Sequence, residues 1–274
     1  MRTDALPKEP VPLSAEQAES MLQSHLKKHQ VAIVLLHWWN ASVWGLELLT
    51  GLALISSPWF RVAPAWLVEM VEGLFGSRAN LLRFHVNLGL LWIFVFLVYG
   101  IFGFRTFLGR EVLQKEIGLD RDDWRWLIVR TLRILGRSRE PLPPQGVYNA
   151  GQKLFALAVY SLLPVIMLTG LVMAFQLFGP AAVGWAVVLH FAAVGLVVAG
   201  LLIHVYMGAV FPEEKPAFFS MITGEVNEHY AYRHHFKWWR EVKQAELEWA
   251  ERQGAEGQPA GAPSSTGPGP TSPA

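Results

Sequence analysis

Residues 189–206 read LHFAAVGLVVAGLLIHVY, a segment in which His190 and His204 are the only strongly polar side chains. A helix of about 20 apolar residues spans the roughly 30 Å hydrocarbon core of a bilayer. Fourteen positions separate the two histidines, which on an α-helix corresponds to almost four turns, about 40° in azimuth and about 21 Å along the axis. One face of a membrane-spanning helix therefore carries an imidazole near each end.

The rest of the chain has the composition of a membrane protein. Its 274 residues are 52% hydrophobic and only 16% charged, which is too apolar for a soluble domain of this length. None of the apolar segments resembles a cleavable signal peptide, because about thirty mostly polar residues precede the first one. We predict an all-α integral membrane protein with a bundle of four transmembrane helices at about 31–56, 84–104, 154–178 and 184–211.

The placement of positive charge predicts how this bundle is oriented. The formal net charge of +1 indicates neither nucleic acid nor an acidic partner. Of the 23 Lys and Arg, Arg61, Arg78 and Arg83 lie between the first two spans, none lies between the last two, and the other 20 lie elsewhere (23 − 3). By the positive-inside rule, both termini and the central loop are cytoplasmic. We expect a multi-pass protein of the bacterial inner membrane.

Four of the nine histidines lie inside the predicted spans, where a polar ring is costly unless it has a partner. With both termini cytoplasmic, His37 and His204 lie toward the cytoplasmic side, and His85 and His190 toward the outer side. Each leaflet thus holds two imidazoles from two different helices. This arrangement predicts two b-type haems stacked across the membrane, the outer iron bound by His85 and His190 and the inner iron by His37 and His204.

Other uses of these histidines are weaker or stay open. The chain has no cysteine, which excludes disulfides, thiolate-bound iron–sulfur clusters and covalent c-type haem. Zinc fits less well, because each pair lacks a carboxylate or thiolate to complete a tetrahedron. A single histidine in a span is more often hydrogen-bonded to a neighbouring helix, and a histidine-based proton channel or transporter remains the alternative from another class.

The remaining segments are assigned by composition. Residues 1–30 form a cytoplasmic segment that contains a helix starting near Ser14 or Ser20. A helix at about 120–137 is rich in Trp and Arg and is expected to lie on lipid headgroups. Residues 244–274 are expected to be largely disordered. Glu47 lies well inside the first span and needs a partner or a proton, and no internal repeat is evident.

Several longer motifs resemble one family. They are LHWWNASVWGLELLTGLAL (36–54), RFHVNLGL (83–90), YNAGQKLFA (148–156) and the tail PEEKPAFFSMITGEVNEHYAYRHHFKWW (212–239). Together with the paired histidines of the fourth span, they make the chain from about residue 30 to residue 243 similar to the cytochrome b (gamma) subunit of membrane-bound formate dehydrogenases. The resemblance implies a four-span dihaem cytochrome b domain over 31–243, with 212–243 as a cytoplasmic tail.

The resemblance also implies partners and a direction of electron flow. A periplasm-facing iron–sulfur subunit would pass electrons to the outer haem, and a quinone would be reduced beside the inner haem, near the cytoplasmic side. The oxidation of formate would belong to a separate catalytic dehydrogenase subunit, not to this chain. A cytochrome b subunit of a hydrogenase or of another quinone-linked dehydrogenase is the alternative, because its haem helices would look alike.

In the resembling family the quinone pocket maps onto Asn149, Ala150, Gly151 and Gln152. Asn149 and Gln152 begin the third span at the cytoplasmic side, where their amides can donate hydrogen bonds to quinone carbonyls. Asn149 could equally act as the N-cap of that helix, or do both. Arg83 could meet haem propionates or anchor the membrane edge. For His229, His234 and His235, partner docking, a place at the quinone entrance and solvated surface positions all stay open.

Overall fold

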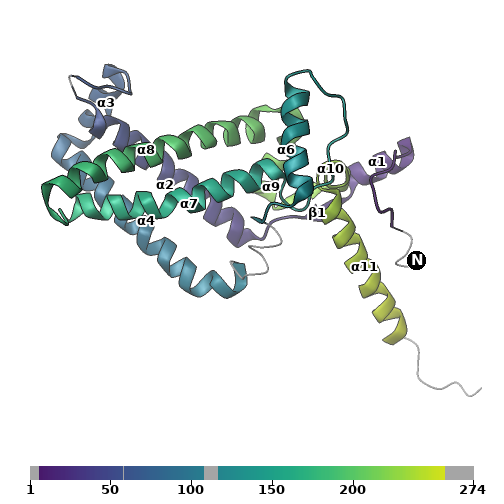
Figure 1. Ribbon diagram of the computed structural model, residues 1–274. Coiled ribbons are helices and arrows are strands. Elements are labelled where there is room, and N and C mark those ends of the chain that lie inside the picture. Colours follow the sequence, from purple (N-terminus) through teal and green to yellow (C-terminus); the bar gives the residue numbers. More distant parts are fainter. Residues whose placement is uncertain (1–5, 58, 108–116, 257–274) are drawn as a thin grey trace, which may run out of the picture.

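The computed structural model describes residues 6–57, 59–107 and 117–256. The described part is mostly helical, and it contains four helices that are long and apolar enough to cross a membrane. These are α2 (Val31–Ile55), α4 (Arg78–Phe107), α7 (Ala150–Ala174) and α8 (Gly179–Val205), which a π-helical turn, η3 (Tyr206–Val210), extends. Figure 1 shows them forming an elongated bundle. The prediction of a mostly helical protein with four apolar helices of membrane-spanning length is confirmed, while a short two-stranded sheet departs from an all-α fold.

Three spans begin earlier than the hydropathy pattern predicts. The second begins at Arg78 instead of about residue 84, the third covers Ala150–Ala174 instead of about 154–178, and the fourth begins at Gly179 instead of about residue 184. In the second and the third span the first helical turn is polar, and hydropathy does not register polar residues as part of a span. Asn149 caps the third helix through its side chain, which sets the start of that helix independently of its hydrophobicity.

The four spans pair as two helical hairpins. α2 packs along α4, and α7 packs along α8. Between the hairpins, Val43 of α2, Trp92 of α4 and Leu163 of α7 form a small buried cluster. Large apolar side chains such as Leu196 and Leu202 are exposed on α8, as expected for a helix surface that faces lipid rather than water.

A short helix, α3 (Ala65–Phe75), covers the end of the bundle where α2 runs into α4. Val71 of α3 is buried against Ala53 of α2 and Leu81 of α4. Gly76 ends the helix with φ +71°, in the left-handed region that glycine adopts most easily. This is the amphipathic piece of the loop between the first two spans, and it packs on the protein as well as facing outward.

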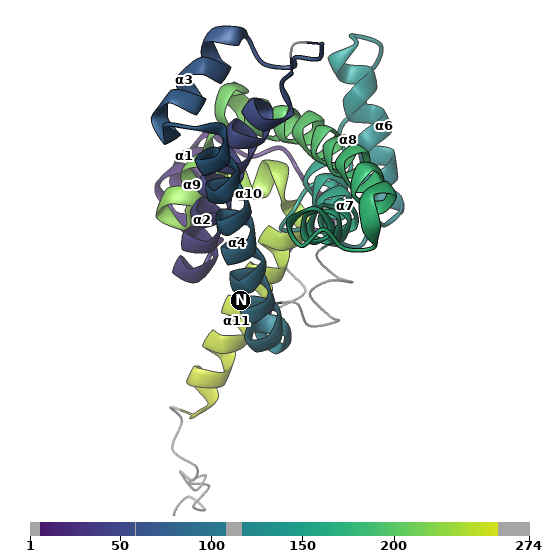
Figure 2. The same cartoon turned by 90° about the vertical axis from the view of Figure 1, so that its left-hand side faces the viewer.

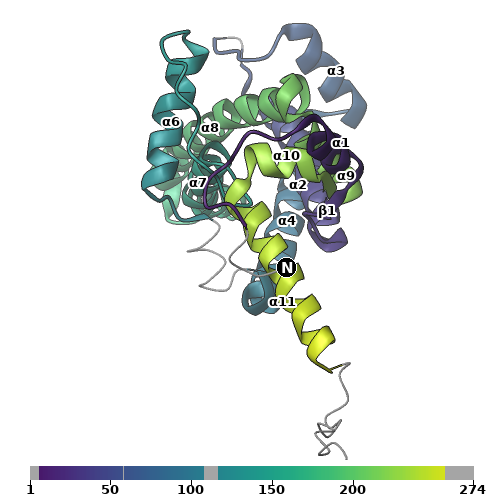
Figure 3. The same ribbon diagram turned by 90° about the vertical axis from the view of Figure 1, so that its right-hand side faces the viewer.

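The opposite end of the bundle carries the N-terminal, central and C-terminal segments together (Figures 1 and 3). Their elements are α1 (Ala15–Gln23), β1 (His25–Lys27), α6 (Arg121–Ile134), η4 (Pro212–Glu214), α9 (Lys215–Thr223), β2 (Glu225–Asn227), α10 (Glu228–His234) and α11 (Phe236–Glu256). Figure 2 views the bundle from the other end, so that α3 lies toward the viewer. The three segments that the charge pattern assigns to one side therefore share one end. Which membrane face this is stays a prediction.

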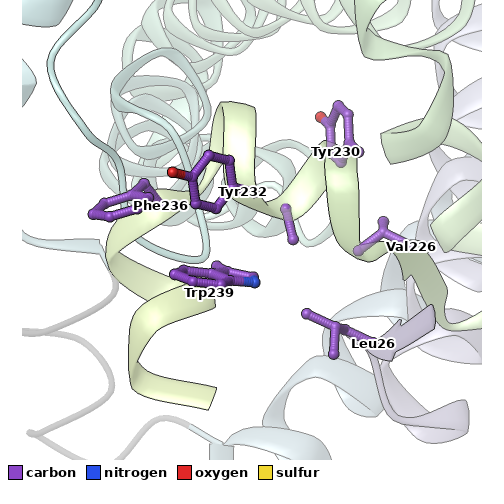
Figure 4. Close-up of a cluster of buried hydrophobic side chains, with 7 residues drawn as sticks. Leu26, Val226, Tyr230, Tyr232, Phe236 and Trp239 are labelled. Carbon is purple, nitrogen blue, oxygen red and sulfur yellow. The ribbon is translucent and has the colours of Figure 1, made fainter. Parts of the chain in front are cut away.

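The N- and C-terminal segments fold against each other. β1 pairs antiparallel with β2, with Leu26 opposite Val226. Ser14 caps α1 through a capping box, and the helix ends at Gln23, before the strand. A hydrophobic cluster joins the two segments (Figure 4) and consists of Leu26, Val226, Tyr230, Ala231, Tyr232, Phe236 and Trp239. The tail at 212–243 is therefore a packed layer rather than a loose extension.

Two further segments differ from their expected form. α6 runs across the end of the bundle (Figure 1), and it buries Asp123, Trp126 and Val129 on its protein side while Trp124 is exposed. The expected contact of α6 with lipid headgroups can therefore involve only its exposed side, which includes Trp124. The expectation of disorder from residue 244 is wrong for 244–256, which continue α11, and 257–274 lie outside the described residues.

Candidate haem and quinone site

The structure brings the rings of His37 and His204, the inner pair, close together. His37 lies two turns into α2, and His204 lies at the end of α8. Their ring centroids are 6.3 Å apart, with the planes at 55°. Two imidazole–metal bonds of about 2 Å and two ring radii of about 1 Å add up to roughly 6 Å. The spacing is therefore compatible with a metal ion bound between the two rings.

His85 of α4 and His190 of α8, the outer pair, are close enough to interact electrostatically. The Nδ1 atom of each ring lies within hydrogen-bond distance of other protein atoms. The Nδ1 atom of His190 lies 3.1 Å from the carbonyl oxygen of Ile166 and 3.0 Å from Thr169 Oγ1. Because a carbonyl oxygen only accepts, Nδ1 carries the proton, and the lone pair on Nε2 is available to a metal.

The same reasoning applies to His85. Its Nδ1 atom lies 2.9 Å from Thr50 Oγ1 and 2.6 Å from a carboxyl oxygen of Glu47. The Thr50 hydroxyl donates its own proton to the carbonyl of Leu46, 2.7 Å away, so its oxygen accepts from the imidazole. His85 thus also presents Nε2 as its free nitrogen. Glu47, which the sequence left without a partner, has one here.

The residues around both pairs fit haem better than a small metal site. Across residues 6–57, 59–107 and 117–256, no three His, Asp or Glu side chains cluster as a metal-ion site would need. Each pair consists of two imidazoles, the donor set of a bis-histidine haem. A Cβ atom at Gly51 would lie 3.4 Å from His85 Cε1, and one at Gly170 would lie 3.6 Å from His190 Cε1. The absence of a side chain at these two glycines thus leaves room for the imidazoles of both outer histidines.

The candidate quinone residues form the start of α7. The Asn149 side-chain oxygen accepts from the Gln152 backbone N–H at 3.0 Å, and the Gln152 side-chain oxygen accepts from the Asn149 N–H at 2.9 Å. This capping box uses only the oxygens of the two amides. Their NH2 groups remain donors, so capping and quinone binding are compatible. Gly151 lies against the Trp126 ring, which a Cβ atom would approach to 3.7 Å.

Buried polar contacts hold this helix start in place. The side chain of Gln145, almost fully buried, accepts from the Ala150 backbone N–H at 2.6 Å. Lys153 forms a buried ion pair with Asp123 of α6 at 2.8 Å and also donates to the carbonyl of Gly118. A helix start buried in this way needs such partners, because its first N–H groups have none within the helix.

The tail histidines have different positions. His235 is fully buried, donates through Nδ1 to the carbonyl of Gly146 at 2.8 Å, and lies 3.2 Å from Lys28 Nζ. A solvated surface position is therefore wrong for His235. Burial lowers the pKa of His235, and burial lowers the pKa of Lys28 to about 8. His234 stacks on Tyr230, and both His234 and His229 are partly exposed.

His29 completes the link between the N-terminal segment and the candidate quinone residues. It is buried, and its ring stacks on Tyr148, the residue before Asn149, with centroids 6.4 Å apart. Burial, together with the nearby charges of Lys28 and His37, lowers the pKa of His29 to about 4. The ring is therefore neutral near pH 7. No local pattern in the sequence indicates this contact, since the two residues are far apart along the chain.

Arg130 of α6 is a further residue that the sequence did not single out. Its guanidinium lies 5.1 Å from the centre of the Phe211 ring and 3.7 Å from a carboxyl oxygen of Glu213. Within the part of the chain that the structure describes, its Nε and Nη2 atoms are buried and have no hydrogen-bond partner. Arg125, on the same helix, forms an exposed ion pair with Glu140 instead. Arg83 is exposed at the start of α4.

Residues 28–224 match the model of the family described as prokaryotic cytochrome b561. The chain belongs to this family. As a prokaryotic cytochrome b561, it is an integral membrane protein that binds haem b. All four span histidines and the residues from Asn149 to Gln152 lie inside the matched region.

Two relatives of the chain are cytochrome b subunits of formate dehydrogenases. The cytochrome b556(Fdn) subunit of the nitrate-inducible formate dehydrogenase of Escherichia coli K12 is 30% identical over 139 residues, 49% of this chain and 62% of the relative. The formate dehydrogenase cytochrome b556 subunit of Haemophilus influenzae is 24% identical over 225 residues, 81% of this chain and 85% of the relative. The resemblance to formate dehydrogenase cytochrome b subunits is confirmed. The chain spans less than two thirds of the E. coli subunit.

Proposed function

We propose that this cytochrome b561 is the membrane-anchor subunit of a formate dehydrogenase and that it carries electrons through two b-type haems to a quinone. The observation that carries the proposal is the arrangement of the four span histidines. They form two pairs from different helices, and the 6.3 Å between the ring centroids of the inner pair is compatible with an iron atom between the rings. Bound in these two places, haem supplies one-electron carriers at two depths of the membrane.

The protein's part at the outer site is to hold two imidazoles in a fixed tautomer. Ile166 and Thr169 orient His190, while Thr50 and Glu47 orient His85. Such partners behind a metal ligand fix its ring and raise its basicity. At this site the partner of the chain is an iron–sulfur subunit on the periplasmic face, itself bound to the catalytic dehydrogenase subunit that oxidises formate.

At the inner site, His37 and His204 hold the second haem next to the quinone residues. The NH2 groups of Asn149 and Gln152, which the capping box does not use, can donate to the two carbonyl oxygens of a quinone. Reduction of a quinone to a quinol takes two electrons and two protons. Because α7 begins at the end of the bundle that carries the described N- and C-terminal elements, the protons come from that side, which we assign to the cytoplasm on the positive-inside rule.

The domain organisation follows from the same assignment. Residues 31–243 form the dihaem cytochrome b domain, with 1–30 and 212–243 packed together on its cytoplasmic end. The exposed apolar surface of the spans contacts membrane lipid. Nothing in the charge balance favours nucleic acid. The chain itself has no cysteine for iron–sulfur clusters, so the donor clusters belong to the partner.

The test uses native membranes of a strain that expresses the chain with an affinity tag. We expect formate, but not hydrogen, to reduce the b-type α band anaerobically, and the dehydrogenase and iron–sulfur subunits to co-purify with the tag. Reduction by hydrogen together with co-purification of a hydrogenase would replace the formate donor with the alternative one. A purified protein without a reducible b-type spectrum would overturn both cytochrome assignments and favour a proton channel.

A further inference from the structure

The two hairpins hold their outer histidines with the same short motif. Leu-Thr-Gly-Leu occurs at 49–52 in α2 and again at 168–171 in α7. In each copy the threonine hydroxyl contacts Nδ1 of a histidine on the second helix of the hairpin, at 2.9 Å for Thr50 and 3.0 Å for Thr169. In each copy the glycine lies beside the same imidazole. The sequence alone showed no repeat, because the match is only four residues long.

The two copies differ three residues before the threonine. That position is Glu47 in α2 and Ile166 in α7. In α7, the backbone carbonyl of Ile166 and the threonine hydroxyl lie within hydrogen-bond distance of His190 Nδ1, and the Ile166 side chain is apolar. In α2, the Glu47 side chain reaches the imidazole, with Oε2 2.6 Å from His85 Nδ1. Each outer histidine therefore has a threonine hydroxyl at its Nδ1 atom. Within the described part of the chain, only His85 of this pair also has a carboxyl group there, that of Glu47.

The surroundings of Glu47 are arranged around this contact. Glu47 and His85 have side chains that are only 20% and 22% exposed. The other oxygen, Oε1, is buried and has no hydrogen-bond partner among the residues that the structure describes. It faces Gly89 on α4, where a Cβ atom would lie 3.6 Å away. A carboxyl group deep in a span is costly, and the polar partner of Glu47 in the structure is the candidate haem ligand His85.

We propose that Glu47 is a positioning residue that makes His85 a stronger iron ligand than His190 and lowers the midpoint potential of the outer haem. The proposal rests on the proposed haem-binding function. A carboxyl oxygen that accepts from Nδ1–H increases the electron density on the ligating Nε2. A more electron-rich ligand stabilises ferric over ferrous iron, and hydrogen bonding to the ligand is an established control of haem potential. The lower outer potential favours electron flow toward the inner haem.

The test compares three variants of the purified complex. Glu47→Ile copies the residue at the matching position of α7, Glu47→Gln keeps the shape and an oxygen acceptor, and Glu69→Gln removes an exposed carboxyl of α3 at the same end as a control. Potentiometric titration of the α band gives both midpoint potentials. The ferric low-spin electron paramagnetic resonance spectrum reports the ligand field of each haem. Pyridine haemochrome analysis gives the haem content.

We expect Glu47→Ile to raise one midpoint potential by at least a tenfold change in the ferric-to-ferrous ratio, 59 mV for a one-electron couple. Glu47→Gln should shift it less, in the same direction. One of the two low-spin signals should move, while Glu69→Gln leaves both signals and both potentials as in the wild type. If the Glu47→Ile protein loses the outer haem, the proposal is tested on Glu47→Gln instead, by its midpoint potentials and its electron paramagnetic resonance spectrum.

Two results would overturn the proposal in distinguishable ways. If the variants keep two haems with wild-type potentials and spectra, Glu47 does not tune His85, and the dihaem function stands. If the wild-type protein contains no haem, the proposed function fails and the inference fails with it.

Discussion

The ring of Phe155 in α7 stacks on His204 in α8, with ring centroids 5.1 Å apart and planes 21° apart. A third residue makes this contact possible. At Gly200, one turn before His204, a Cβ atom would lie 2.8 Å from a carbon of the Phe155 ring, closer than non-bonded carbons approach. Glycine at this position therefore lets the phenylalanine lie flat against α8 beside the inner candidate ligand.

Gly200→Ala should disturb the inner haem and leave the outer one intact. The added methyl forces Phe155 to move, and overpacking of this kind costs about 1–3 kcal/mol. We expect lower inner-haem occupancy in spectra of the purified protein and a lower melting temperature. Gly195→Ala, on the same helix at a position with open space, is the matched control. A second change, Phe155→Leu, should restore part of the loss, and Gly200→Ala with unchanged spectra and stability would contradict this role.

Asn149 should prove to do two jobs that a single pair of variants can separate. Serine is about as good an N-cap as asparagine, and alanine costs about 1 kcal/mol at such a position. Asn149→Ser therefore keeps the cap and removes the amide donor, while Asn149→Ala removes both. We expect both variants to slow quinone reduction and only the alanine variant to lower the melting temperature.

The control for Asn149 is Asn227→Ser, because Asn227 caps α10 by accepting from the Tyr230 N–H at 2.7 Å, away from the quinone residues. That variant should reduce quinone at the wild-type rate. An Asn149→Ser protein with full quinone reductase activity would restrict Asn149 to helix capping.

The buried pair of Lys153 and Asp123 should show strong coupling. Their side chains are 7% and 2% exposed, so replacing one partner leaves a buried charge without compensation, at a cost of roughly 3–5 kcal/mol. We expect Lys153→Met to lower thermal stability sharply. Adding Asp123→Asn should recover a large part, because asparagine is uncharged and can still accept from the Asp120 N–H. Strictly additive losses in the double variant would rule out a coupled pair.

Acidification should destabilise the fold through His29. Its pKa is about 4 in the folded protein and 6.5 ordinarily, so between these values the unfolded chain binds more protons than the folded one. Stability therefore rises as the pH increases from about 4 to about 6.5 and is independent of this group above that range. His29→Phe keeps a ring against Tyr148 without the titration. The melting temperature of the variant should fall less than that of the wild type between pH 6.5 and 4.5, and equal slopes would contradict the assignment.

The sequence allowed the bundle and the candidate ligands to be predicted because both depend on local patterns. A span is a continuous apolar run, and its direction follows from nearby Lys and Arg. Given these, the depth of each span histidine follows from its position in the run. The structure then brings His37 and His204 together, as that reasoning requires. Helix starts were less predictable, since the polar first turns of α4 and α7 carry no hydropathy signal.

Contacts between distant segments could not be predicted from such patterns. Leu26 pairs with Val226 and His235 donates to Gly146, and no local spacing indicates either pairing. The packing of the 212–243 tail against the N-terminal segment was therefore not predicted, although its Tyr, Phe and Trp residues provide the hydrophobic cluster that packs it. Glu47 shows the same limit. An acid in a span indicates that a partner exists, but only the packing of α2 on α4 shows that the partner is His85.

The most direct test of the account counts haem in the purified wild-type protein and in paired histidine variants by pyridine haemochrome analysis. We predict two protohaems per chain in the wild type and one in His37→Ala/His204→Ala, whose changes fall within a single site. His37→Ala/His85→Ala, which breaks both sites, should contain none. Fewer than two protohaems in the wild type, or one retained in the variant that breaks both sites, would contradict the two bis-histidine pairs.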